Sequence, residues 1–194
     1  MADRLQASRV KPPGRQPPWI AARRERTAPP VDAYAPLAYI IYVIWRKVSM
    51  SALAVAKKLG GRGVLHRKIA SDRDLIEAVR AGLPAKALDH VLKDWAKQLS
   101  QGDVYRVVGR ARTLQRKRTR GTSLSADESD RLVRLARILV RAEEALGDEE
   151  KARCWLTEEN RALGGDRPLS LLDSDAGTLA VERVLGRIEH GVYS

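Results

Sequence analysis

Helix boundary signals recur from Ser71 to the end of the chain, and they constrain its fold more than any other feature. Successive apolar segments begin at Ser or Asp residues that can cap a helix, and several end at Gly. Ala, Leu, Arg and Glu dominate the composition, and the 194 residues include no Phe. Because these residues favour helices over strands, we predict an all-α fold.

Three helices are predicted between residues 71 and 109, and Leu75, Ile76 and Val79 form the apolar face of the first. Their boundary residues are Ser71 and Gly82 for the first, Pro84 for the start of the second, and Ser100 and Gly109 for the third. Residues 60–63, before the first helix, match neither the dinucleotide fingerprint nor the phosphate-loop pattern. We therefore predict that they form a flexible basic turn.

A further short helix over residues 110–120 follows the tight turn at Gly109, and Leu114 is its one apolar anchor. Two short helices joined by a tight turn are the layout of a helix-turn-helix. Gln115 can pair with an adenine edge, and Arg112 or Arg116 with guanine. The alternative interpretation is a solvated basic helix face.

Eight residues of this segment are candidates for DNA binding, and three of them, Lys117, Arg118 and Arg120, suit phosphates. The eight are Arg110, Arg112, Thr113, Gln115, Arg116, Lys117, Arg118 and Arg120. The surrounding charge agrees with this prediction, because residues 71–121 carry 12 Lys/Arg against 6 Asp/Glu. Residues 122–194 carry 10 against 15, so a polyanion is expected to bind the basic part and a different partner the acidic part.

A long amphipathic helix is predicted from Ser125, which makes a capping box with Glu128, to about Leu146. Its apolar stripe at helical spacing packs either in the core of its own domain or against a second copy. The stripe consists of Leu132, Leu135, Ala136, Leu139, Ala142 and Leu146.

Two more helices are predicted in the acidic C-terminal part, the first capped by Asp148 and the last beginning at residues 173–175. Val181, Leu185, Ile188 and Val192 share one face of the last helix. The neighbouring carboxylates at residues 143–144 and 149–150 are interpreted as solvated helix surface, because adjacent residues on a helix point in different directions. They do not form a general acid and base pair, and no catalytic or metal-ligand constellation is recognised elsewhere.

Residues 1–50 are predicted to be a basic leader without a fold of its own, or the product of an upstream start codon chosen in error. Residues 1–36 are rich in Arg and Pro, and the apolar stretch 37–45 is far shorter than the roughly 20 residues of a membrane helix. Neither a transmembrane span nor a signal peptide is expected. With Cys154 as the single cysteine, we expect a cytoplasmic protein.

The chain shows a resemblance to a known family in three C-terminal segments, residues 147–153, 162–169 and 186–193. They closely resemble the C-terminal domain of the Xre/MbcA/ParS antitoxins, which are partners of RES-domain toxins that consume NAD. Residues 112–116, Arg-Thr-Leu-Gln-Arg, match the family's Arg-Thr-Leu-x-Arg segment. The chain departs from the family at Cys154, at Ser174 where the family tends to show Thr, and in the leader.

The resemblance implies that the C-terminal segment covers the toxin's NAD pocket and blocks it; from spacing alone, a frayed end is the alternative. The toxin-binding residues are then Arg187, Ile188, Glu189, His190, Gly191, Val192, Tyr193 and Ser194. The predicted organisation is a leader (1–50), a helix-turn-helix DNA-binding domain (51–124) and a toxin-binding domain (125–194).

The resemblance also implies the partners of the protein. They are a RES-domain toxin, operator DNA and a second copy in a homodimer, assembled into a higher toxin–antitoxin complex. Such an antitoxin represses its own operon and is neither an enzyme nor in need of a cofactor. The alternative function is that of a stand-alone helix-turn-helix regulator without a toxin partner.

Overall fold

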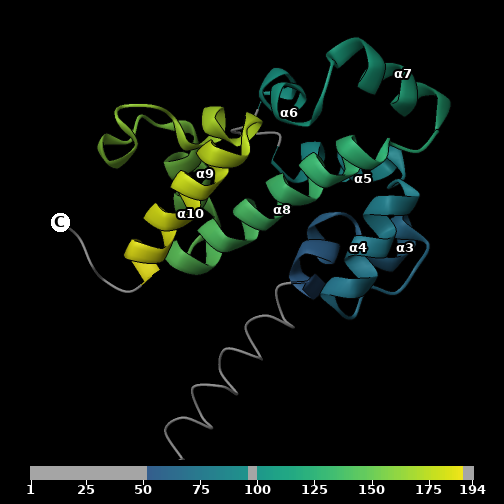
Figure 1. Ribbon diagram of the computed structural model, residues 1–194, viewed down its shortest axis with the longest axis horizontal. Coiled ribbons are helices and arrows are strands. Elements are labelled where there is room, and N and C mark those ends of the chain that lie inside the picture. Colours follow the sequence, from purple (N-terminus) through teal and green to yellow (C-terminus); the bar gives the residue numbers. More distant parts are fainter. Residues whose placement is uncertain (1–51, 96–99, 190–194) are drawn as a thin grey trace, which may run out of the picture. The chain divides into compact units, whose positions relative to one another are not determined.

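The computed structural model describes residues 52–95 and 100–189, and within these ranges every regular element is a helix (Figure 1). The predicted all-α fold is therefore confirmed. Predictions about residues 1–50 lie outside the described residues. After a helical segment at residues 52–58, the elements are α3 (Gly61–Leu65), α4 (Asp72–Ala81), α5 (Ala85–Asp94), α6 (Gln101–Val108), α7 (Ala111–Arg120), α8 (Ala126–Leu146), α9 (Glu149–Thr157), η2 (Arg161–Leu163), η3 (Pro168–Asp173) and α10 (Asp175–Glu189).

The predicted helix starts are confirmed, because each capping side chain accepts a hydrogen bond from the backbone of its own first turn. Ser125 and Glu128 form the predicted capping box of α8, in which the Ser125 N–H donates to the Glu128 carboxylate over 2.8 Å. Ser71 forms a second box at the start of α4. Ser100 and Asp148 cap α6 and α9 in the same way. Local sequence alone therefore sets these boundaries.

The 21-residue helix α8 is the central support of the described fold. Its apolar stripe packs into one continuous core. Helix α8 contacts α4 and α6, which precede it in the sequence, and α9, η3 and α10, which follow it. Burial of so many apolar side chains along one helix is the main source of stability here. The predicted DNA-binding and toxin-binding parts thus share a core.

The turn between α4 and α5 is joined to the connection between α7 and α8. Gly82 has φ 84°, and a Cβ there would lie 2.5 Å from the carbonyl oxygen of Leu124, so glycine is required. The Leu83 N–H donates to the buried Ser129 hydroxyl over 2.8 Å, and the Leu83 carbonyl accepts from the Leu124 N–H over 2.8 Å. These contacts hold the start of α8 against the turn between α4 and α5.

Two local predictions were wrong. Residues 61–63 form the first turn of α3, because Leu65 on the same short helix is buried in the core and tertiary packing outweighs the low helix propensity of glycine. Ile76 lies outside the buried face of α4 and is 48% exposed. The core takes Leu75 and Ala78 instead, and Ile76 falls on the flank of that face.

Candidate nucleic-acid interface and C-terminal segment

Helices α6 and α7 are joined by Gly109 and Arg110 and form the predicted helix-turn-helix layout. In α6, Val104, Val107 and Val108 are buried, and the helix packs against α8 and η3. In α7, Leu114 is the buried residue, with 0% exposure. The first helix is thus embedded in the fold, while the second lies on its surface.

The outer face of α7 carries cationic side chains that make no ion pair within residues 52–95 and 100–189. Thr113 is partly buried on the flank. The exposed candidates are Arg110, Arg112, Gln115, Arg116 and Arg120. Donors that are free and solvated in this way are what contacts to base edges and phosphates require.

Lys117 and Arg118, also predicted to bind DNA, point toward the protein. Lys117 forms an ion pair with Glu128 at the start of α8. Arg118 pairs with Asp89 of α5 and donates to the Tyr105 hydroxyl of α6. Both residues follow Leu114 by three or four positions, so they lie on its side of the helix, and this spacing is a signal that the sequence analysis missed.

These contacts shift the pKa of Glu128 and of Arg118. Burial raises the pKa of Glu128, but hydrogen bonds from Lys117 and from the Ser125 N–H outweigh it, so the pKa lies below its usual 4.5. Burial likewise opposes the charged form of Arg118, yet Tyr105 and Asp89 outweigh it and raise the pKa of this guanidinium. The charged forms of Glu128 and Arg118 are thus favoured, and their contacts hold α7 to its neighbours at both edges.

The last helix, α10, begins in close contact with η3. A Cβ at Gly177 would lie 2.1 Å from the carbonyl oxygen of Leu171, so the two backbones approach as closely as a glycine allows. Val181 and Leu185 are buried as predicted, and Ile188 is half-buried against the core. Shape complementarity therefore positions α10.

Three of the predicted toxin-binding residues lie at the end of α10. Arg187 and Glu189 are exposed there, next to the half-buried Ile188. The other five predicted residues, His190, Gly191, Val192, Tyr193 and Ser194, lie outside the described residues.

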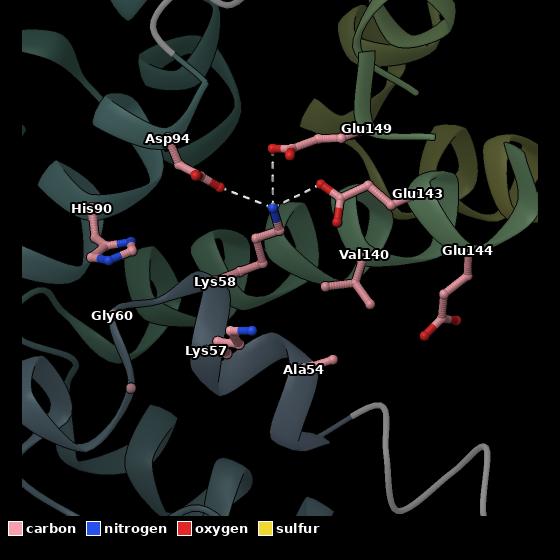
Figure 2. A pocket seen from close by; sticks show the side chains of 11 residues that line it. Ala54, Lys57, Lys58, Gly60, His90, Asp94, Val140, Glu143, Glu144 and Glu149 are labelled. Atoms are coloured by element: carbon pink, nitrogen blue, oxygen red, sulfur yellow. Dashed lines mark hydrogen bonds and ion pairs between the residues drawn. The ribbon is translucent and has the colours of Figure 1, made fainter. Parts of the chain in front are cut away.

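A cluster of charged side chains around Lys58 joins the 52–58 helix to three other helices (Figure 2). The Lys58 Nζ lies 2.9 Å from Asp94 Oδ2 of α5, 2.7 Å from Glu143 Oε1 of α8 and 3.5 Å from Glu149 Oε1 of α9. The same amine lies 5.8 Å from the ring centroid of the buried Trp95. The cluster borders a cavity of about 730 Å³.

Burial and the ion pairs have opposing effects on the pKa values in this cluster. Burial lowers the pKa of Lys58, but Glu143 and Asp94 outweigh it and raise the pKa above 10.5. Burial raises the pKa of Glu143 above 4.5, against the opposing effect of Lys58. The interpretation of Glu143 as solvated surface was therefore wrong, because a lysine far away in sequence pairs with it, whereas Glu144, Glu149 and Glu150 are exposed as predicted.

The cluster has the features of a structural ion-pair network. One amine contacts three carboxylates, and the described residues that border the cavity include no Ser, Thr, Cys or Tyr side chain. Among the described residues, no group of three or more His, Cys, Asp or Glu side chains is arranged to hold a metal ion. None of their helices is long and apolar enough to cross a membrane.

Two family models match this chain in tandem. The antitoxin Xre-like helix-turn-helix domain matches residues 74–137, and the antitoxin Xre/MbcA/ParS C-terminal toxin-binding domain matches residues 141–191. The fold and these matches define a helix-turn-helix protein that carries a toxin-binding domain. The two matches meet inside α8.

Individual relatives agree with the family models. The chain is similar to Antitoxin Xre of Photorhabdus laumondii, with 36% identity over 115 residues that cover 58% of this chain and 76% of the relative. Antitoxin Xre of Yersinia enterocolitica is 32% identical over 122 residues, 62% of this chain and 81% of the relative. A protein of Sphingobium named Prs ADP-ribosylating antitoxin is 26% identical over 156 residues, 72% of this chain and 96% of the relative. The chain belongs to the Xre antitoxin family.

Proposed function

We propose that this antitoxin neutralises a RES-domain toxin that consumes NAD by covering the toxin's NAD site with its C-terminal segment, residues 187–194. It acts by stoichiometric binding in the cytoplasm and not as an enzyme. Through the outer face of α7 it also represses its own operon, as a homodimer within a larger toxin–antitoxin complex. The proposed division into a DNA-binding part (51–124) and a toxin-binding part (125–194) follows the two functions.

The observation that carries the proposal is the extent of the toxin-binding family match, which reaches residue 191. The match thus includes the exposed end of α10, where Arg187 presents a charged group next to the half-buried Ile188. Exposed Arg and Tyr side chains supply large contact areas and directed hydrogen bonds at protein interfaces. A segment of this kind is suited to fill and block a polar pocket on the toxin.

The DNA part of the proposal is supported by the free cations on α7. Because Leu114 holds the inner side of α7, the arginines of its outer face are presented to solvent without partners among the described residues. In a homodimer, two such helices would meet successive major grooves about 34 Å apart.

The experiment uses a RES-domain toxin, taken from beside the antitoxin gene if one is encoded there, and follows NAD consumption. The full-length chain should abolish it, whereas a chain that lacks residues 191–194 should restore most of the toxin's turnover. This truncation should cost little folding stability, because it removes no residue of the described core. Tyr193→Ala should weaken inhibition by roughly 1–3 kcal/mol if the ring is an interface anchor.

Two results would contradict different parts of the proposal. Full inhibition by the truncated chain would move the blocking contacts to the preceding face of α10, at Val181 to Ile188. Undiminished NAD consumption in the presence of the full-length chain would reject the RES-domain partner. Thermal unfolding followed by circular dichroism serves as the control that both proteins remain folded.

A further inference from the structure

Helix α5 carries two lysines that the helix-turn-helix motif does not include. Lys86 and Lys93 are exposed and make no hydrogen bond or ion pair within the described parts of the chain. They lie seven positions apart, which is two turns of helix or about 10 Å, and therefore on one face. The opposite face of α5 is buried through Ala87, Leu88 and Val91.

The contacts between α5 and α7 give the two helices an antiparallel register. At one end the Ala85 N–H donates to the Thr122 carbonyl over 3.3 Å, and one turn further along α5, Asp89 pairs with Arg118. Lys86 therefore lies beside the C-terminal end of α7. Continuing the register places Lys93 alongside its N-terminal half.

The lysines lie on the outward face of α5, between the side that borders α7 and the side that borders Gly60. Asp89 points to α7, and the spacing of Lys86 and Lys93 places both between Asp89 and His90 around the helix. His90 lies on the other side, since a Cβ on Gly60 would be 3.0 Å from its Cδ2.

No unpaired carboxylate of α5 opposes these lysines. Asp89 is paired with Arg118, and Asp94 is paired with Lys58 over 2.9 Å. Both acidic side chains of the helix thus have partners within the protein, although Asp94 shares Lys58 with Glu143 and Glu149, and the outward face keeps the charge of its two lysines. A duplex brought to α7 would meet positive charge on both helices.

We propose that α5 is part of the DNA interface and that Lys86 and Lys93 bind backbone phosphates beside the groove that α7 enters. This inference rests on the proposed DNA binding by α7. Lysine is a point charge that grips phosphate without reading sequence, so the two residues add affinity and orientation but no base preference. The DNA site is then wider than the two-helix motif.

The test measures binding of the full-length chain to a duplex from the promoter region of its own operon and to an unrelated duplex of the same length, across a salt series. In Lys86→Gln/Lys93→Gln, affinity for both duplexes should fall by the same factor. The slope of log affinity against log salt should become less steep by about 1.8, because two phosphate contacts are lost. Lys86→Arg/Lys93→Arg should keep the slope of the natural chain and shows that folding is intact.

A matched control is Lys151→Gln, which removes an exposed lysine of α9 and should leave the slope unchanged. Arg112→Gln/Arg116→Gln should instead remove the preference for the promoter duplex. An unchanged slope in the Lys86→Gln/Lys93→Gln variant overturns the inference while leaving the proposed function intact, and so does weaker toxin inhibition with unchanged DNA binding. No promoter preference in the natural chain rejects the proposed repression itself.

Discussion

Helices α7 and α10 are both positioned on the shared support of the fold, but by different means. Of the ten residues of α7, Leu114 is buried, and ion pairs of Lys117 and Arg118 hold its edges. Helix α10 buries four side chains and seats its first turn on η3 at Gly177, where only hydrogen fits. A helix held by charge at its edges keeps its outer face free for a ligand, whereas a helix held by shape depends on close fit.

If α7 binds DNA and α10 leads to the toxin-binding segment, reversing two charges on α7 should separate the two functions. Arg112→Glu/Arg116→Glu should abolish binding to the promoter duplex, since each bidentate contact to guanine is worth about 1–3 kcal/mol and the new carboxylates repel phosphate. Toxin neutralisation should persist, because α10 and the C-terminal segment are unaltered. A promoter-reporter assay and a toxin-rescue assay measure the two effects.

The truncation of residues 191–194 is the reciprocal control, because it should spare repression and impair neutralisation. Normal repression by the Arg112→Glu/Arg116→Glu variant would contradict the assignment of α7 as the DNA-binding helix. Loss of both activities in that variant would show that the two functions are not separable.

A substitution in the buried face of α8 should affect DNA binding and toxin neutralisation together, because both parts of the molecule pack on this helix. Leu139 is 0% exposed in the continuous core, and Leu139→Ala should lower the free energy of unfolding by about 2–5 kcal/mol. Promoter binding and toxin inhibition should fall together as the temperature rises. Chemical denaturation measures the change, and Leu179→Ala at the 48% exposed position of α10 is the control, with an effect within about 0.5 kcal/mol.

Loss of one activity alone in Leu139→Ala would contradict the view of α8 as a common support. It would indicate that the two parts fold independently and that the core between them is not cooperative.

The sequence predicted the helices well because their boundaries depend on local contacts. Ser100 and Asp148, for example, cap the helices that follow them through bonds to residues three positions away. The partners of the inward-facing cations could not be predicted, since Arg118 meets a residue 29 positions away and Lys58 one 36 positions away. Charge alone does not say on which side of a helix an arginine is paired.

The close fit of α10 predicts a measurable cost for one added methyl group. Gly177→Ala would bring a Cβ into the Leu171 carbonyl, so α10 must shift on η3, and we expect a loss of about 1–3 kcal/mol in the free energy of unfolding. Toxin inhibition should weaken more than promoter binding. Urea denaturation and both activity assays measure these effects.

The matched control is the same substitution later in the same helix. At Gly186 a Cβ meets the flexible end of Arg141 at 3.4 Å, so Gly186→Ala should be neutral or stabilising through its better helix propensity. Equal losses at Gly177 and Gly186 would show that the backbone approach to η3 is not what seats α10.

The ion pair between Lys117 and Glu128 at the edge of α7 predicts the smallest change in the free energy of unfolding, and this change depends on pH. Glu128→Gln keeps a side-chain acceptor for the capping box but removes the ion pair with Lys117. Because the pKa of Glu128 is lowered in the folded protein, its ionised form stabilises the fold above pH 4.5, and this contribution is lost as the pH falls through the lowered pKa. The variant should lose about 0.2–1 kcal/mol at pH 7, as a partly exposed pair does.

Urea denaturation of the natural chain and the variant at neutral and acidic pH measures the difference between their free energies of unfolding. That difference should vanish at the acidic end, and Glu144→Gln on the exposed side of α8 should show no comparable change. A loss of equal size at every pH would mean that the carboxylate acts through packing or capping. The edge of α7 would then be held by shape, as α10 is, and the contrast between the two helices would disappear.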